Sequence, residues 1–207
     1  MSESPDQLRV EIERLQQENE KLRASNRRWM RIAGTDDLTG LPNKVYFSTV
    51  ILPQFISQAS ADGEGFVCVM VAPDKLGEIN LRFGRNGGDQ VIKEVAAFIK
   101  ENMESDERIV HIDGANFIVM MPRADNAVCK KRTRQLRARA VSRRFSCGEE
   151  SVVLTLSMGT VVLPAELGGD VQAKDVGSEV LRRLNAALDQ AKKQGGDQVV
   201  DDSGDFS

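Results

Sequence analysis

Residues 108–121 read RIVHIDGANFIVMM, and this stretch determines the centre of the predicted fold. Two short apolar segments, about 108–112 and 116–121, flank the pair Asp113-Gly114. Asp-Gly between two apolar runs is a strong hairpin signal, because both residues tolerate the positive φ angles of a tight turn. The stretch therefore predicts two short strands on either side of a turn.

Further strands and helices are expected on both sides of this hairpin. Residues 66–72 are a continuous apolar run between Gly65 and Pro73, which predicts a strand buried on both faces. Asn43 has a suitable side chain to cap the start of a helix. The remaining expected elements are helices over about 86–103, 124–143 and 176–194, a long strand over 151–163 and a short strand at 199–200.

An apolar heptad repeat occupies residues 6–33. A seven-residue repeat makes a narrow seam that pairs with a second helix, and an Asn at an a position pairs with itself in a parallel two-stranded coil. The alternative is a lone amphipathic helix packed against its own domain. The charged flanks favour a coiled-coil helix over residues 1–34. Its dimerisation seam consists of Leu8, Ile12, Leu15, Asn19, Leu22, Asn26 and Trp29.

Composition indicates an ordinary cytoplasmic protein. The chain has 207 residues, 41% of them hydrophobic, and a formal net charge of −3, so it shows no overall bias towards nucleic acid or membrane. Its polar N-terminus lacks the pattern of a secretory signal. Three cysteines without metal-ligand spacing predict free thiols in a reducing compartment.

Two motifs upstream of the hairpin resemble those of the GGDEF family, whose members make cyclic di-GMP from two GTP. Residues 36–43 (DDLTGLPN) resemble the family's opening signature D-x-L-T-G-L-P-N. Residues 79–89 (INLRFGRNGGD) resemble its I-N-D…F-G-H-x-x-G-D segment. Aligned from these motifs, the family's G-G-D-E-F falls on Asp113, Gly114, Ala115, Asn116 and Phe117.

This resemblance implies an α+β fold and covers residues 36–200. In the family fold a central, mostly antiparallel five-stranded sheet is flanked by helices. The strands and helices expected in this chain follow the order βααββαβ, with the hairpin at its centre. We expect the coiled-coil helix to precede a degenerate GGDEF domain over residues 35–200. A disordered tail is expected over residues 201–207, because it is short and polar.

The family's reaction depends on carboxylates that hold two metal ions, and several of these are replaced here. By the resemblance, Ala72 stands where the family has its first metal-binding Asp, and Asn116 stands where it has its metal-binding Glu. The segment's second Asp is kept as Asp74. We therefore expect no catalytic residue, metal or cofactor, and a protein that is not an enzyme. The other replaced positions are Gly77, Asp113 and Ala115.

Three residues match family positions that bind guanine nucleotide. Asn80 and Asp89 match the residues that hold the base, since an amide and a carboxylate complement the guanine edge. Lys192 matches a phosphate-binding lysine, whereas Gly196 replaces an arginine. We expect weak binding of guanine nucleotide at most. The alternative is that Asn80 caps a helix or turn and Asp89 caps the next one.

The family's inhibitory product site, R-x-x-D, falls on Glu104 and Glu107. Arginine binds guanine or phosphate through two parallel hydrogen bonds, and a glutamate in its place inverts the charge. The resemblance therefore predicts that this inhibitory site is lost. His111 stands where the family has an arginine before its signature turn, and a lone histidine is more often structural than catalytic.

Residues 130–144 (KKRTRQLRARAVSRR) carry eight basic side chains and no acidic one. Two interpretations stay open, a solvated helix face and a docking surface for an anionic partner. The segment lacks interleaved aromatic residues, and the chain has no helix-turn-helix or zinc pattern, so nucleic acid is disfavoured.

Together these patterns predict a non-enzymatic regulatory or scaffolding module in bacterial signalling related to cyclic di-GMP. It would act through protein–protein interaction, as a homodimer or with a coiled-coil partner, on a signalling protein that the sequence does not identify. The alternative is a receptor for GTP or cyclic di-GMP that does not turn its ligand over.

Overall fold

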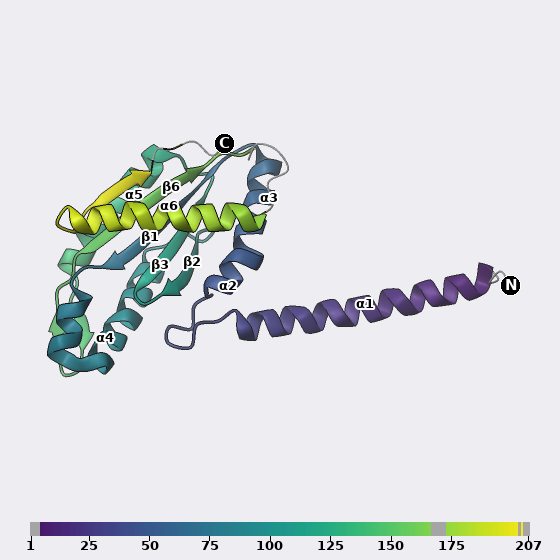
Figure 1. Cartoon of the computed structure of the whole chain (residues 1–207), viewed down its shortest axis with the longest axis horizontal. Helices are drawn as coiled ribbons and strands as arrows, with labels where there is room; N and C mark the ends of the chain where they lie inside the picture. Colours follow the sequence, from purple (N-terminus) through teal and green to yellow (C-terminus); the bar gives the residue numbers. More distant parts are fainter. Residues whose placement is uncertain (1–4, 167–172, 203, 205–207) are drawn as a thin grey trace.

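A long N-terminal helix, α1 (Pro5–Ala33), extends away from an α+β domain in the computed structural model (Figure 1). The structure describes residues 5–166, 173–202 and 204. The predicted seam side chains of Leu8 and Asn26 lie outside the described residues, as do tail residues 203 and 205–207. The seam must therefore be judged from its other members.

The domain is built on a five-stranded sheet with the order β2-β3-β1-β6-β7. The strands are β2 (Arg108–Asp113), β3 (Asn116–Pro122), β1 (Phe66–Pro73), β6 (Leu156–Leu163) and β7 (Val199–Asp202). All neighbours pair antiparallel except β6 and β7, which are parallel. The α+β class and the mostly antiparallel sheet predicted from the sequence are thus confirmed.

Helices cover both faces of this sheet. On one face lie α4 (Leu76–Glu101) and α5 (Asn126–Ser142), and on the other lie α3 (Leu52–Asp62) and α6 (Ala173–Lys193). The central strand β1 is buried along its whole length, because its alternate side chains point into the two different apolar cores. This confirms the strand that the continuous apolar run predicted.

Asn43 joins α1 to the domain. Its side-chain oxygen accepts hydrogen bonds from the backbone N–H groups of Val45 and Tyr46, at 3.0 and 3.1 Å, which caps α2 (Lys44–Tyr46) as predicted. Its amide nitrogen donates to the carbonyl of Ala33 at 2.8 Å, where α1 ends. From α2 the chain passes through a π-helical turn, η1 (Phe47–Ile51), into α3.

Helix α4 begins ten residues earlier than the predicted helix over 86–103, at Leu76 rather than residue 86, and it is kinked. The kink lies at Gly84, whose φ of 69° and ψ of 179° are not helical. Gly88 lets the two halves approach, because a Cβ atom there would lie 1.8 Å from Oδ1 of Asn80. The apolar periodicity of the sequence predicted only the second half of α4, after the kink.

Two further differences lie near the end of the chain. The long strand expected over 151–163 is two elements, because β5 (Glu150–Val152) pairs with β4 (Phe145–Cys147) around a turn at Gly148 and leaves the main sheet. β7 includes Asp201 and Asp202, which were expected in a disordered tail. Their backbone pairs with β6, and Arg183 holds the Asp202 carboxylate at 2.8 Å.

Candidate functional site

The two positions that the resemblance assigns to metal ligands meet at one end of the sheet. Val71 of β1 pairs with Phe117 of β3 at the end of their ladder, and Ala72 and Asn116 are the next residues on the two strands. On its other side Ala72 pairs with Ser157 of β6. Ala72 is fully buried, and its methyl group packs in the apolar core on the α3 and α6 face.

The predicted hairpin turn is closed by its own polar side chains. Asn116 donates a hydrogen bond from Nδ2 to Oδ1 of Asp113 at 2.7 Å. Gly114 adopts a φ of 51°, the left-handed conformation that glycine accommodates readily. Both polar groups that stand in the signature turn are therefore engaged with each other, and the Ala115 methyl group packs against the core.

Asp74 is buried directly after β1 and joins three segments. Its carboxylate accepts hydrogen bonds from the hydroxyls of Thr155 and Ser157, both at 2.6 Å, and from the backbone N–H of Asp197 at 2.9 Å. Gly196 lies against it, since a Cβ atom there would be 3.0 Å from the Asp74 carboxyl carbon. These contacts give Asp74 a structural role, which the sequence pattern did not reveal.

Asn80 and Asp89 both lie within α4, on the two sides of its kink. The two halves of α4 begin after Lys75 and after the kink at Gly84. Neither Asn80 nor Asp89 stands at these positions or makes a capping hydrogen bond in the described part of the chain, so the alternative that they act as caps is wrong. The kink brings the Asn80 amide against Gly88, the residue before Asp89. Among the described residues neither side chain has a hydrogen-bond or ion-pair partner, and both are exposed.

Lys192, the third predicted nucleotide contact, lies exposed in the last turn of α6. That helix ends just before Gly196, which packs against Asp74 at the same end of the sheet as Ala72. The fold thus brings the end of α6 to the sheet end where β1 finishes. The roles of Asn80, Asp89 and Lys192 stay predictions.

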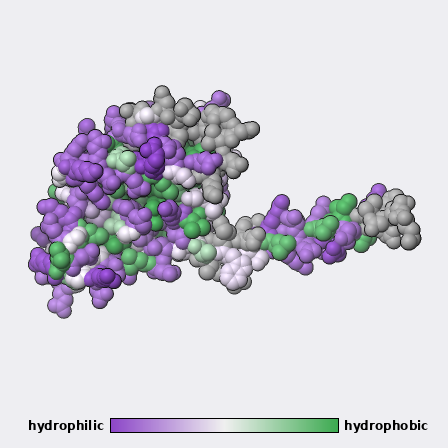
Figure 2. Space-filling view, in the orientation of Figure 1, coloured by the Kyte–Doolittle hydropathy of each residue, from purple (hydrophilic) through white to green (hydrophobic). Residues whose placement is uncertain are grey.

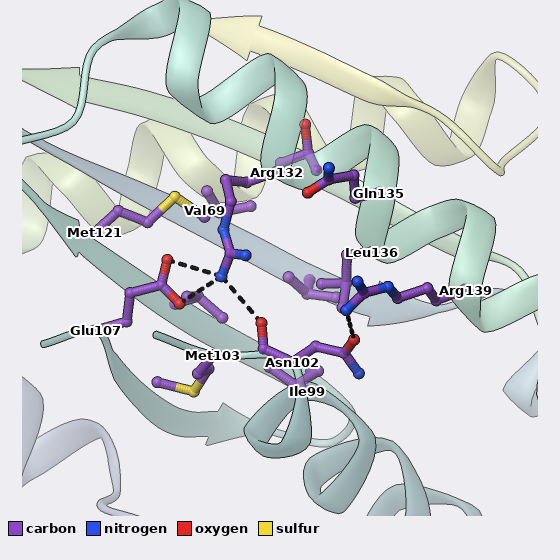
Figure 3. A pocket seen from close by; sticks show the side chains of 13 residues that line it. Val69, Ile99, Asn102, Met103, Glu107, Met121, Arg132, Gln135, Leu136 and Arg139 are labelled. Carbon is purple, nitrogen blue, oxygen red and sulfur yellow. Dashed lines mark hydrogen bonds and ion pairs between the residues drawn. The ribbon is translucent and has the colours of Figure 1, made fainter. Parts of the chain in front are cut away.

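Arg132 of α5 lies next to the positions of the predicted inhibitory site (Figure 3). Its guanidinium lies 2.9 Å from the buried carboxylate of Glu107 and 3.1 Å from Glu104. It also donates to the carbonyl of Asn102 at 2.9 Å. Beside it is a cavity of about 20 Å³ with mainly apolar walls, room for roughly one water molecule.

Most of the basic side chains of residues 130–144 have partners within the domain. Of the eight basic residues in 130–144, three have no partner among the described residues, namely Lys131, Arg134 and Arg144. The other five have acidic or amide partners, and the contacts pair Lys130 with Asp201, Arg132 with Glu104 and Glu107, Arg137 with Asp197, Arg139 with Asn102, and Arg143 with Glu94 and Glu101. Internal pairing therefore accounts for most of the run, an explanation that the sequence did not suggest.

The segment after α1 contacts the signature turn through Asp36 and His111. The carboxylate of Asp36 lies 2.8 Å from Nδ1 of His111 and accepts hydrogen bonds from the backbone N–H and hydroxyl of Thr39. Burial opposes ionisation of Asp36, but the hydrogen bonds from Thr39 and His111 outweigh it and hold its pKa below the usual value. Nε2 of His111 lies 2.9 Å from the carbonyl oxygen of Gly114.

Other candidate chemistry is sparse in the part of the chain that the structure describes. That part contains no group of three or more His, Cys, Asp or Glu residues placed to hold a metal ion. All three cysteines are buried free thiols, and burial raises the pKa of Cys129 to about 12. None of the described helices combines the length and apolar character needed to cross a bilayer.

Comparison with known proteins gives a family match over most of the chain. The family model described as "Diguanylate cyclase, GGDEF domain" matches residues 33–198. The diguanylate cyclase DgcP of Pseudomonas aeruginosa is 27% identical over 165 residues, which cover 80% of this chain and 23% of that protein. The response regulator PleD of Caulobacter vibrioides is 27% identical over 173 residues, covering 83% of this chain and 36% of PleD.

A solved structure that includes a coiled coil is also similar. The coiled coil and GGDEF domain of DgcB from Caulobacter crescentus, in complex with c-di-GMP, align with a TM-score of 0.72 and 25% identity. The alignment covers 94% of this chain and 98% of that one. By contrast, the chain spans only about a quarter to a third of the two curated relatives.

These comparisons contradict the expectation that the chain is not an enzyme. The matching family is one of diguanylate cyclases, and relatives carry that name. Loss of two carboxylates does not by itself abolish a metal site. Mg²⁺ in nucleotide sites is held by one or two carboxylates together with water and the substrate's own phosphates, so replacing carboxylates weakens a metal site without removing all of its ligands.

Proposed function

Because the chain belongs to the family of diguanylate cyclase GGDEF domains, we propose that it acts in cyclic di-GMP signalling as a dimeric regulatory module. In this proposal α1 pairs with the α1 of a second copy and sets the placement of the two domains. The family's reaction joins two GTP molecules, so two domains must be placed relative to each other. A pair of α1 helices would control this placement.

The exposed seam of α1 carries this proposal. Ile12, Leu15, Leu22 and Trp29 are each at least half exposed, at 53, 50, 60 and 65%. Figure 2 shows hydrophobic side chains along α1 between hydrophilic ones, on a helix that stands free of the domain. An apolar stripe of this kind is stabilised when a second helix covers it.

The polar member of the seam favours a second copy of this chain as the partner. Asn19 lies at an a position on the described part of α1 and is exposed. Two Asn19 side chains in register would hydrogen-bond each other in a parallel pair, whereas an apolar partner would leave the amide unsatisfied. The similarity to the coiled coil and GGDEF domain of DgcB supports a coiled coil at α1.

The test is the oligomeric state of the chain, measured by analytical ultracentrifugation across a concentration series. We expect wild type to be a dimer and the variant Leu15→Asp/Leu22→Asp to be a monomer. Val10→Asp/Gln17→Asp is the matched control, because it introduces the same two acidic side chains at positions outside the seam. A dimer that persists in Leu15→Asp/Leu22→Asp would overturn the proposal.

A second candidate function is binding of guanine nucleotide at α4. The observation that favours it is the kink at Gly84, which brings Asn80 beside Gly88 and leaves the side chains of Asn80 and Asp89 exposed without partners among the described residues. An amide and a carboxylate at neighbouring positions can satisfy the donors and acceptors of guanine.

Calorimetric titration with GTP and with cyclic di-GMP, each with and without Mg²⁺, tests this candidate. We expect binding of GTP that is lost in Asn80→Ala and Asp89→Ala and retained in Asn86→Ala, an exposed control on the same helix. Analysis of the same samples for cyclic di-GMP measures turnover directly. Equal binding by all three variants would exclude α4 as the nucleotide site.

A further inference from the structure

The imidazole of His111 lies between two hydrogen-bond acceptors. Its Nδ1 is 2.8 Å from Oδ1 of Asp36, and its Nε2 is 2.9 Å from the carbonyl oxygen of Gly114. The side chain is 5% exposed, and its ring stacks on that of Phe117 with 4.8 Å between centroids. An ionised carboxylate and a carbonyl only accept, so both contacts are hydrogen bonds only when both ring nitrogens carry a proton.

We propose that His111 is a pH-sensitive clamp, which in its doubly protonated form ties the segment after α1 to the signature turn at Gly114. A neutral imidazole has a proton on one nitrogen only. Loss of a proton therefore breaks one of the two contacts and sets a nitrogen lone pair against an oxygen atom. The clamp is complete when the ring is charged and incomplete when it is neutral.

The charges around the ring favour the closed clamp. Asp36 is the carboxylate in contact with His111, and Asp37 beside it is exposed. Asp113, on the same strand, is exposed and bonded to Asn116. The other elements next to the ring add little charge: α2 carries an exposed Lys44 and a half-buried Tyr46, and β3 contributes the Phe117 ring and has no charged residue.

The direction of the pH effect follows from these contacts. Imidazole is the side chain that changes charge between about pH 5 and 8. Deprotonation of the ring as the pH rises breaks one contact of the clamp, so the stabilisation by the clamp is present on the acidic side and lost on the basic side. Asp36 remains ionised well below that range, because its pKa is lowered, and its own contribution is lost only at more acidic pH.

The clamp connects two parts of the molecule that matter for the site. The backbone N–H of His111 also donates to the carbonyl of Pro42 at 2.8 Å, one residue before the Asn43 that binds the end of α1. On the other side, Gly114 lies between Asp113 and Asn116 in the signature turn. Loss of one ring contact at His111 would therefore loosen the turn relative to the segment that carries α1, while the backbone bond to Pro42 remains.

Nitrogen-15 NMR of protein labelled at histidine gives a direct test, since His111 is the only histidine and its ring signals need no assignment. We expect both ring nitrogens to be protonated at the acidic end of a pH series and only one at its basic end. A ring that keeps one protonation state throughout the series in which the protein is folded would overturn the proposal.

Hydrogen exchange of the turn amides at residues 113–116 measures the consequence. After correction for intrinsic rates, we expect protection to fall roughly five-fold from the lower to the higher pH, the effect of one hydrogen bond. His111→Arg, charged at both pH values, should show no such fall, and His111→Gln should show the weaker protection at both. The same pH dependence in His111→Gln as in wild type would contradict the clamp. Asp36→Asn gives a second route if a His111 variant fails to fold, and it should abolish the fall.

Discussion

Arg132 on α5 lies 2.9 Å from the carboxylate of Glu107, a residue that is only 7% exposed, and so holds α5 to the segment between α4 and β2. The backbone N–H of Glu104 also donates to this carboxylate, at 2.8 Å. The Nε atom of Arg132 is buried without a hydrogen-bond partner, which lowers the net stabilisation that the pair provides. Removing one member alone should nevertheless be costly, because the other remains as a buried charge.

We therefore predict that Arg132→Met lowers the free energy of unfolding by about 3 kcal/mol. Arg134→Met is the matched control, since Arg134 is exposed on the same helix without a partner among the described residues, and it should change stability by less than about 0.5 kcal/mol. Urea unfolding measures both. The double variant Arg132→Met/Glu107→Leu should recover much of the loss, and equal stability of the two Met variants would refute the argument.

Asn43 serves two helices at once, and its loss should affect both. Asn43→Ala removes the N-cap of α2 and the amide that binds the end of α1, so we expect stability to fall by about 1–2 kcal/mol. Asn185→Ala is the control, because Asn185 is exposed in α6 and bonds only the Leu181 carbonyl of its own helix. It should be neutral or slightly stabilising.

Hydrogen exchange distinguishes this role of Asn43 from a general loss of stability. The amides of residues 33–36, at the junction with α1, should lose protection in Asn43→Ala beyond the change seen in the core strand β1. A uniform loss across both regions would show that Asn43 acts only as a cap of α2.

Asp74 should contribute to stability through the three segments that it joins. Asp74→Asn keeps the shape but removes the negative charge and one of the two oxygen acceptors that two hydroxyls and a backbone N–H share, so we expect a loss of about 2 kcal/mol. Asp189→Asn is the control, an exposed acid near the C-terminal end of α6, and it should be neutral or slightly favourable. Thermal unfolding of the two variants separates these outcomes, and equal losses would remove the structural role assigned to Asp74.

Local signals in the sequence predicted much of the fold. The Asp113-Gly114 turn, the apolar run over 66–72 and the capping side chain of Asn43 each depend on near neighbours, and each is found in the structure. The kink of α4 at Gly84 was missed, since the pattern before it mixes apolar and polar residues without a clear period. The β4–β5 hairpin was missed for a related reason, because three-residue strands are too short to show alternation.

Contacts between distant segments explain why the site was only partly predicted. The pairing of β1 with β3 brings Ala72 and Asn116 to the same end of the sheet, next to the pair Val71–Phe117, but their assignment to one metal site stays a prediction. The pairing of Asp36 with His111 and of Glu107 with Arg132 joins segments far apart in the chain, which no local pattern records. The same limit applies to activity, since the inference from lost carboxylates to a protein that is not an enzyme is contradicted by the family match.

The nearness of Ala72 and Asn116 suggests a direct test of how these two positions affect metal binding. In the variant Ala72→Asp/Asn116→Glu two carboxylates would stand on adjacent antiparallel strands, each one residue beyond the pair Val71–Phe117, within reach of one hard cation. Without metal we expect the variant to be less stable than wild type by several kcal/mol, roughly the cost of burying an unpaired carboxylate at position 72.

Mg²⁺ should reverse that loss. We expect the melting temperature of Ala72→Asp/Asn116→Glu to rise with Mg²⁺ concentration, and its formation of cyclic di-GMP from GTP to exceed that of wild type by roughly ten-fold or more, since about 1.4 kcal/mol of transition-state stabilisation is a factor of ten. Ala72→Asn/Asn116→Gln is the matched control, with nearly the same shapes and no added charge, and should respond to neither. If the carboxylate variant is as insensitive to Mg²⁺ as this control, positions 72 and 116 do not form a metal site in this fold.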